Sequence, residues 1–329
     1  MTNTDSIRQA LVTLLPGGER LTAVRTLATG FSNETYRLEG LDAILRLPPS
    51  AGAVLDGHDV LGQARIYRAL GEMPGAPPVP AITHIGDDPA VLGVPFFVMG
   101  LVPGEALHDL DMQPWFTDVP PERRTEMCRD WIAAFARLAT LPTLDVLGPA
   151  VSAEDYVRRW RGVAAEAEAG ELVDLYDRLL ALSAPVSGAP SLVHGDPKIS
   201  NLMWDEGRIS AMLDWEMALN SEPLSDLGYL LFFFASPFHG ATRGPAQSGM
   251  LDRAGVIDCW EQTSSRSAAG VEWHEIAQIG KLCTIMAKGI HMIATGASSD
   301  PKFAAFRNYF DASQAAMRAM LDAYTGDAA

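Results

Sequence analysis

Hydrophobic and polar positions follow different periods along the chain. In the first third, residues 22–24 and 35–38 alternate in character, and residues 43–46 follow a turn at Glu39-Gly40. These features predict the strands of a small antiparallel sheet. Residues 60–70 instead predict a helix, which the proline and glycine cluster at residues 73–80 ends.

The pattern becomes helical after residue 103. The apolar stretch 94–102 predicts a buried strand that Pro103-Gly104 stops, and residues 122–141 and 153–182 carry apolar side chains three and four positions apart. The change predicts an α+β chain of two parts, residues 1–103 and residues 104–329, with helices dominating the second.

Composition and charge narrow the kinds of partner. The chain of 329 residues has 41 acidic and 25 basic side chains, for a formal net charge of -16. Such a surface repels nucleic-acid phosphates and anionic membranes, so neither is an expected partner. The longest apolar run, residues 227–235, is far shorter than the roughly 20 residues that cross a bilayer. A small molecule is therefore the expected partner.

The cysteines and the amino terminus indicate a cytoplasmic location. Cys128, Cys259 and Cys283 are far apart and lack metal-site spacing, which fits a reducing compartment. The first nine residues are polar and carry Asp5, so they do not predict a secretory signal. Nothing in this pattern indicates an oligomeric state.

One strand-rich island, residues 192–213, lies inside the helical part and carries the candidate chemistry. Asp196 and Asn201 lie in a loop after an apolar strand, and Asp214 ends a second apolar strand after a hairpin turn at residues 205–207. Each residue alone has a structural interpretation, as a turn, a cap or a helix start. Together they offer the oxygen ligands that Mg²⁺ prefers and a carboxylate that accepts a proton from an attacking hydroxyl. Their joint order favours phosphoryl transfer.

The island resembles a known family. His194-Gly195-Asp196, followed after four residues by Asn201 and later by Asp214-Trp215-Glu216, is similar to the signature of the aminoglycoside phosphotransferase-like superfamily. The resemblance implies a bilobal protein-kinase-like fold with a small antiparallel-sheet lobe and a larger helical lobe. It also implies transfer of the γ-phosphoryl group from ATP or GTP, with Mg²⁺, to a hydroxyl of a small molecule.

The resemblance assigns roles within the island. Asp196 becomes the catalytic base, and Asn201 and Asp214 become the magnesium ligands. Lys198 is expected to neutralise charge on the transferring phosphoryl group, with a solvated loop lysine as the alternative. Asp226 is similar to a buried aspartate of the family that holds the catalytic loop through backbone hydrogen bonds.

Residues 1–103 resemble the nucleotide-binding lobe of the family, with departures from its pattern. Ser32 and Asn33 lie in a turn that resembles the phosphate-covering turn, although it is poorer in glycine. Arg46 takes the position of the phosphate-binding lysine of protein kinases. The position of its usual glutamate partner holds Gln63, which cannot form that ion pair, so a hydrogen bond or another carboxylate would hold Arg46.

The apolar stretch that precedes Pro103-Gly104 resembles a kinase hinge. The resemblance places Met99 in the adenine pocket and pairs backbone groups of Gly100 and Val102 with the base, although an ordinary buried strand explains the apolar side chains equally well. The sequence resembles the branch found fused to or beside acyl-CoA dehydrogenases more than the antibiotic-resistance enzymes.

Two other functions stay open at the level of sequence. Gln63 and the glycine-poor turn also fit a catalytically silent nucleotide-binding relative. A metal-dependent hydrolase built from His194, Asp196 and Asp214 is the third hypothesis, although the chain lacks a second histidine-rich cluster.

Overall fold

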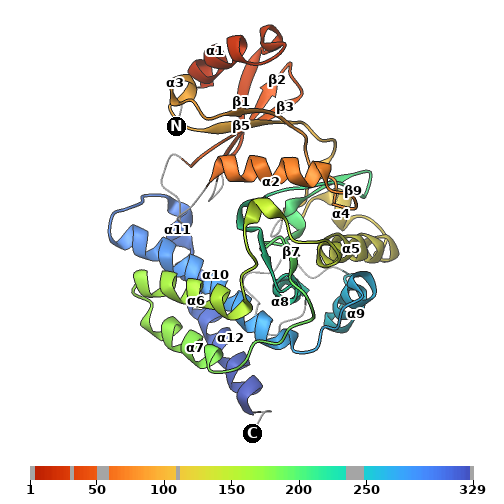
Figure 1. Cartoon of the computed structure of the whole chain (residues 1–329), viewed down its shortest axis with the longest axis vertical. Helices are drawn as coiled ribbons and strands as arrows, with labels where there is room; N and C mark the ends of the chain where they lie inside the picture. The colour runs from red at the N-terminus through yellow and green to blue at the C-terminus, as the bar shows by residue number, and fades with distance from the viewer. Residues whose placement is uncertain (1–3, 30–32, 50–58, 109–111, 235–247, 327–329) are drawn as a thin grey trace.

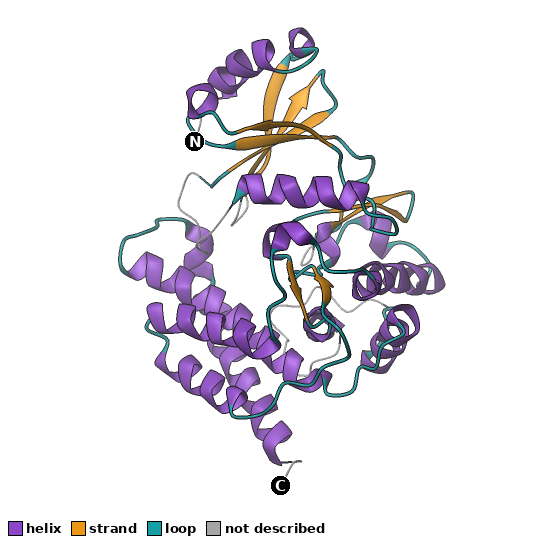
Figure 2. Cartoon of the chain, in the orientation of Figure 1, coloured by secondary structure: helices purple, strands orange, loops and turns teal. Residues whose placement is uncertain are grey.

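A computed structural model describes residues 4–29, 33–49, 59–108, 112–234 and 248–326. The first part of the chain forms a sheet with helices on it, and the second part is mostly helical (Figure 1, Figure 2). The α+β arrangement expected from the sequence is confirmed. Among the described helices, none combines the length and the apolar character needed to cross a membrane.

The sheet is five-stranded and antiparallel, in the order β1-β2-β3-β5-β4. Its strands are β1 (Ala23–Thr29), β2 (Glu34–Glu39), β3 (Ala43–Leu47), β4 (Ile82–Gly86) and β5 (Phe96–Gly100). Alternation in the sequence predicts β1, β2 and β3, and the apolar stretch predicts β5. The edge strand β4 was not predicted, because Gly86 is its one fully buried residue and no apolar alternation marks it.

Each face of the sheet is covered by a helix. On one face lies α1 (Thr4–Leu14), which buries Ile7 and Leu11 against a core that includes Leu38. On the other lies α2 (Val60–Glu72), as predicted, whose Tyr67 ring centroid is 6.0 Å from that of Phe97. The apolar pattern of the sequence does not predict α1, because the polar side chains of its exposed face mask the two buried positions. A one-turn helix, α3 (Pro89–Leu92), precedes β5.

Short strands hold the island together inside the helical part. β7 (Ser191–Val193) pairs with β10 (Leu219–Ser221). β8 (Leu202–Asp205) and β9 (Arg208–Met212) form the predicted hairpin. The positive φ angles of Glu206, 49°, and Gly207, 73°, make the tight turn. The two-residue strand β6 (Glu105–Ala106) extends this hairpin along β8.

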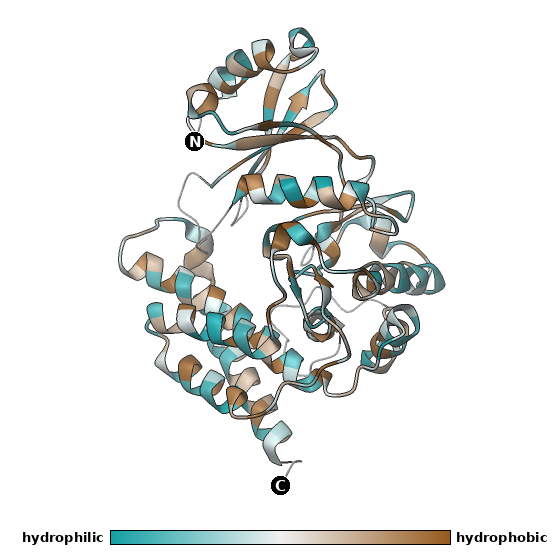
Figure 3. Ribbon diagram, viewed as in Figure 1, coloured by the Kyte–Doolittle hydropathy of each residue, from teal (hydrophilic) through white to brown (hydrophobic). Residues whose placement is uncertain are grey.

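Helices make up most of the second part of the chain. They are α4 (Pro114–Thr117), α5 (Pro121–Ala136), α6 (Ala153–Glu166), α7 (Gly170–Leu180), α8 (Leu224–Phe234), α9 (Arg253–Ser264), α10 (Val271–Ala294), α11 (Pro301–Ala305) and α12 (Arg307–Gly326). The predicted helical stretch 153–182 is two helices, because Glu168 between them adopts a positive φ of 57°. Helices such as α2 and α5 show hydrophobic and hydrophilic colours along their turns (Figure 3), as expected for helices with one buried face.

Candidate active site

The loop after β7 is held by backbone hydrogen bonds. The Asp226 carboxylate on α8 accepts the N–H of His194 at 2.8 Å and the N–H of Gly195 at 2.9 Å. Gly195 has a φ of +81°, and a Cβ there would lie 2.3 Å from the carbonyl oxygen of Met217. Only glycine fits this position. The backbone contacts expected of Asp226 are therefore present.

The loop brings three of the predicted residues into contact. The Asp196 Oδ2 lies 2.9 Å from the Lys198 Nζ and accepts a hydrogen bond of 2.9 Å from the Asn201 Nδ2. The same Nδ2 donates to the backbone carbonyl of Asp196 at 2.7 Å. Both bonds of Asn201 use its nitrogen, so its Oδ1 is the atom available to a cation.

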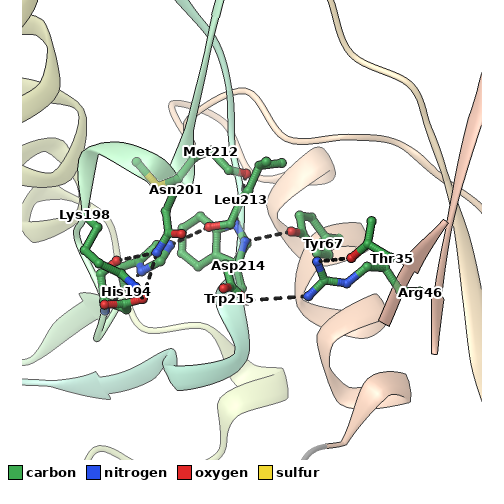
Figure 4. A network of polar contacts seen from close by, with 11 residues as sticks. Thr35, Arg46, Tyr67, His194, Lys198, Asn201, Met212, Leu213, Asp214 and Trp215 are labelled. Atoms are coloured by element: carbon green, nitrogen blue, oxygen red, sulfur yellow. Dashed lines mark hydrogen bonds and ion pairs between the residues drawn. The ribbon is translucent and has the colours of Figure 1, made fainter. Parts of the chain in front are cut away.

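Asp214 joins this group from the end of β9 (Figure 4). The N–H of Leu213 donates to the carbonyl of Asn201 at 2.7 Å, which links the two segments. Asp214 adopts a left-handed conformation with φ 63°, and its N–H donates to the hydroxyl of Tyr67 on α2 at 3.0 Å. Its Oδ1 is buried and has no hydrogen-bond partner among the described residues, while the Nη2 of Arg46 lies 3.6 Å away.

The two aspartates differ in electrostatic environment. Burial raises the pKa of Asp196, but Lys198, Lys281 and Tyr229 outweigh it and lower the pKa to about 2. Burial, with the charge of Glu216, raises the pKa of Asp214 to about 6, although Arg46 opposes the shift. The Asp196 carboxylate is thus already compensated by neighbouring donors. A bound cation would therefore stabilise the charged form of Asp214 more than that of Asp196.

Arg46 on β3 is held without the help of Gln63. Its Nη1 donates to the Thr35 Oγ1 at 3.1 Å, and Asp214 is its ion-pair partner. Gln63 on α2 is 3% exposed, and within the described chain neither its amide oxygen nor its nitrogen has a hydrogen-bond partner. A hydrogen bond and a different carboxylate therefore hold the arginine, as the replacement of glutamate by glutamine requires.

Of the two residues predicted in the phosphate-covering turn, the structure describes one. Asn33 is buried, and its side-chain oxygen and nitrogen have no partner in the part of the chain that the structure describes. Ser32 lies outside the described residues.

The predicted hinge is the end of β5 and the segment after it. Met99 is 6% exposed, and the Gly100 N–H donates to the carbonyl of Ala81 at 2.9 Å. Gly100 therefore has its carbonyl rather than its N–H to offer a base. Val102 follows the strand and is half-buried.

Three residues that contact this site are not predicted from the sequence. Tyr67 binds the Asp214 backbone, Tyr229 hydrogen-bonds Asp196, and Lys281 on α10 donates from its Nζ to the Gly195 carbonyl. A signal existed for two of them. Tyr67 lies four residues after Gln63 on the same face of the predicted helix, and Lys281 is a lone charge in an apolar run.

The site and fold agree with a known family. Residues 23–261 match the model of the family described as "Phosphotransferase enzyme family". The chain belongs to this family. In the described residues, no group of three or more histidine, cysteine, aspartate or glutamate side chains is placed to hold a metal ion.

Particular relatives give the context. Acyl-CoA dehydrogenase family member 10 of Mus musculus is 28% identical over 225 residues, which cover 64% of this chain and 20% of that protein. The chain thus spans about a fifth of the length of this relative. The resemblance to the dehydrogenase-associated branch is confirmed.

Solved structures share the fold. A putative aminoglycoside phosphotransferase from Ralstonia eutropha has a TM-score of 0.75 at 21% identity, covering 97% of this chain and 98% of its own. The aminoglycoside phosphotransferase APH(2'')-Ib, solved with ADP bound, has a TM-score of 0.63 at 14% identity over 94% of this chain and 98% of its own.

Proposed function

We propose that this chain is an ATP-dependent phosphotransferase that moves the γ-phosphoryl group to a hydroxyl of a small molecule. The observation that carries the proposal is the hydrogen-bonded group of Asp196, Lys198 and Asn201 beside Asp214. Asp196 orients the attacking hydroxyl and accepts its proton, and Lys198 neutralises charge on the transferring group. Membership of the phosphotransferase family supports this reaction.

Mg²⁺ fits the residues present. Asn201 has an amide oxygen free of hydrogen bonds to the described residues, and the Asp214 Oδ1 is a buried oxygen without a hydrogen-bond donor. These two residues would hold the ion, which suits a cation that takes few protein ligands and keeps water and phosphate oxygens. When bound, it would shield the negative charge of the phosphate oxygens.

The nucleotide belongs to residues 1–103, the proposed amino-terminal lobe, with residues 104–329 as the acceptor lobe. Arg46 would bind phosphate oxygens bidentately, beside Ser32 and Asn33. Met99 would line the adenine pocket, with the Gly100 carbonyl and the Val102 N–H as base partners. The ADP in the APH(2'')-Ib structure supports an adenine nucleotide, and GTP is the donor to compare with it.

The decisive variant is Asp196→Ala. It removes the base and leaves the residues assigned to nucleotide binding in place, so we expect turnover to fall by about 10²-fold or more. The dissociation constant for ATP should change little. Steady-state transfer of labelled phosphate and calorimetric titration with ATP measure the two quantities. Turnover equal to that of the wild type would end the assignment of Asp196.

The acceptor is to be found with a chemically diverse panel of alcohols. The name of the mouse relative indicates that acyl-CoA chemistry accompanies this domain in a longer protein, so hydroxylated acyl compounds come first in the panel. Aminoglycosides, choline and sugars complete it. Measurements with ATP and GTP in parallel identify the donor.

A second candidate function follows from Gln63. The buried glutamine leaves α2 without the glutamate partner of Arg46, which is the arrangement expected of a silent nucleotide-binding relative. Such a protein would bind ATP with Mg²⁺ and transfer no phosphate to any acceptor. Phosphate transfer that depends on Asp196 excludes this function.

A further inference from the structure

A lysine lies fully buried behind the catalytic loop. Lys281, in the middle of α10, has no exposed surface. An ammonium group away from water is costly unless charges or dipoles compensate it, so buried lysines are rare. Its position therefore calls for specific partners, and none of the roles assigned above uses it.

The partners of Lys281 all belong to the active site. Its Nζ donates to the carbonyl oxygen of Gly195 and lies 4.3 Å from the ring centroid of Tyr229, which itself hydrogen-bonds Asp196. Burial lowers the pKa of Lys281 to about 8, while the charges of Asp196 and Asp226 oppose that shift. The amine is thus mostly protonated at neutral pH.

The contact fixes one particular peptide unit. The carbonyl of Gly195 and the N–H of Asp196 belong to the same planar group. Lys281 donates to the oxygen of this peptide unit, and the N–H of Asp196 donates to the His194 Nδ1 at 3.2 Å. The preceding N–H of Gly195 donates to Asp226. The backbone that enters Asp196 is therefore held at successive polar groups, by α10, by His194 and by α8.

The charge also matters. The loop carries the carboxylate of Asp196, and the carboxylate of Asp226 lies beneath the loop. Both residues are more than nine-tenths buried. Lys198 contacts Asp196 from the loop itself, where its side chain is 30% exposed. Lys281 lies on the buried side, where water cannot screen the two carboxylates.

We propose that Lys281 is a positioning residue for phosphoryl transfer: it fixes the peptide unit that carries Asp196 and supplies the buried positive charge that the two carboxylates share. The inference rests on the proposed function, since positioning matters only if Asp196 acts in catalysis. It assigns no contact between Lys281 and the substrate.

The test is Lys281→Met, which keeps the length of the side chain and removes the donor and the charge. Misplacement of the base predicts a fall in kcat of about 10- to 100-fold with KM for ATP within about twofold of the wild type. The matched control is Tyr176→Phe, which breaks the buried 2.9 Å hydrogen bond to Thr284 one turn further along α10. This control should lose stability and keep its kcat.

A second variant covers a failure to fold. Lys281→Gln keeps a donor for the Gly195 carbonyl without the charge, so its kcat is expected to fall by more than about twofold but by less than that of Lys281→Met. If only Lys281→Gln folds, its kcat must still fall. A kcat within about twofold of the wild type in either folded variant overturns the proposal.

Hydrogen exchange separates this inference from the proposed function. In Lys281→Met, the amides of residues 192–201 should exchange faster than in the wild type, whereas Tyr176→Phe should leave them protected. A wild-type protein that transfers no phosphate would refute the proposed function. Unchanged exchange of this segment in Lys281→Met would refute the positioning role itself.

Discussion

The ring of His194 connects the two ends of the active-site island. It is fully buried, with its centroid 5.1 Å from that of Phe135 and 4.7 Å from that of Trp215. Its Nδ1 accepts the N–H of Asp196, so its Nε2 carries the proton and donates to the Leu213 carbonyl at 2.8 Å. The neutral ring thus joins Asp196 to the residue before Asp214.

This ring gives the fold a dependence on pH. Burial lowers the pKa of His194 to about 4 from its ordinary 6.5. Between these values the unfolded chain binds a proton that the native protein does not, so stability falls as the pH falls through this window. At pH 5 the loss attributable to His194 should be about 2 kcal/mol relative to pH 7.

Urea unfolding followed by tryptophan fluorescence at pH 5 and pH 7 measures this loss. The comparison is with His194→Gln, whose side chain does not titrate and whose Nε2 can donate to the Leu213 carbonyl. Burial raises the pKa of Asp226 to about 6, which has the opposite effect on stability, but Asp226 is present in both proteins. Equal pH dependence in the two would contradict the assignment.

Individual residues differ in how well the sequence predicts them. Asp196, Lys198 and Asn201 lie within six positions, so one loop brings them together and their spacing is a readable signal. Tyr67 contacts a residue 147 positions away, and Lys281 one 86 positions away. Such contacts depend on how helices pack on the loop, which the local pattern does not encode.

At the scale of elements, α8 and α10 support the loop that carries Asp196. α8 carries Asp226 and Tyr229, and α10 carries Lys281. The helices touch at Gly228, where a Cβ would lie 2.7 Å from the backbone nitrogen of Glu275. Their close approach lets side chains from both reach the same glycine of the loop.

Gly228→Ala should separate these helices. Alanine favours a helix over glycine, yet the added methyl group meets backbone atoms that cannot rotate away, so we expect a loss of about 1–3 kcal/mol. Gly162→Ala in α6 is the control, because its Cβ meets nothing within 4 Å and helix propensity predicts a gain of up to about 1 kcal/mol. Thermal unfolding of both variants checks the opposite signs. A stabilised Gly228→Ala protein would contradict the close packing.

The sequence predicts a strand or a helix where burial gives the apolar side chains a regular spacing. β2 and β3 and the hairpin of β8 and β9 follow from alternation and turn residues. β10, a three-residue strand of mixed polarity, carries no such signal and forms because its partner β7 lies beside it. Tertiary pairing, rather than local propensity, decides such strands.

At the scale of the whole molecule, Asp214 is one of the places where the two parts of the chain meet. Tyr67 on α2 and Arg46 on β3 both contact it, at its N–H and at its carboxylate (Figure 4). A ligand bound at Asp214 and Arg46 therefore contacts both parts at once. Binding to the native protein alone raises its stability by mass action.

Mg²⁺ and ATP together should raise the thermal midpoint more than the sum of their separate effects. At a concentration of about 100 times the dissociation constant, the gain in stability is about 2.7 kcal/mol. In Asp214→Ala, added Mg²⁺ should no longer enhance the stabilisation by ATP, because one assigned ligand is lost. Differential scanning fluorimetry with ATP, Mg²⁺ or both measures the effect. An undiminished enhancement in this variant would remove Asp214 from the metal site.

The pairing of Arg46 with Asp214 also bears on the order in which ligands load. A divalent ion that binds alone competes with the Arg46 guanidinium for the Asp214 carboxylate. A divalent ion that binds together with a triphosphate supplies phosphate oxygens with which the Arg46 guanidinium can pair instead of Asp214. We therefore expect the metal ion and the nucleotide to bind as one complex. Arg46 then exchanges the Asp214 carboxylate for phosphate as its counter-ion and is never left as an unpaired charge.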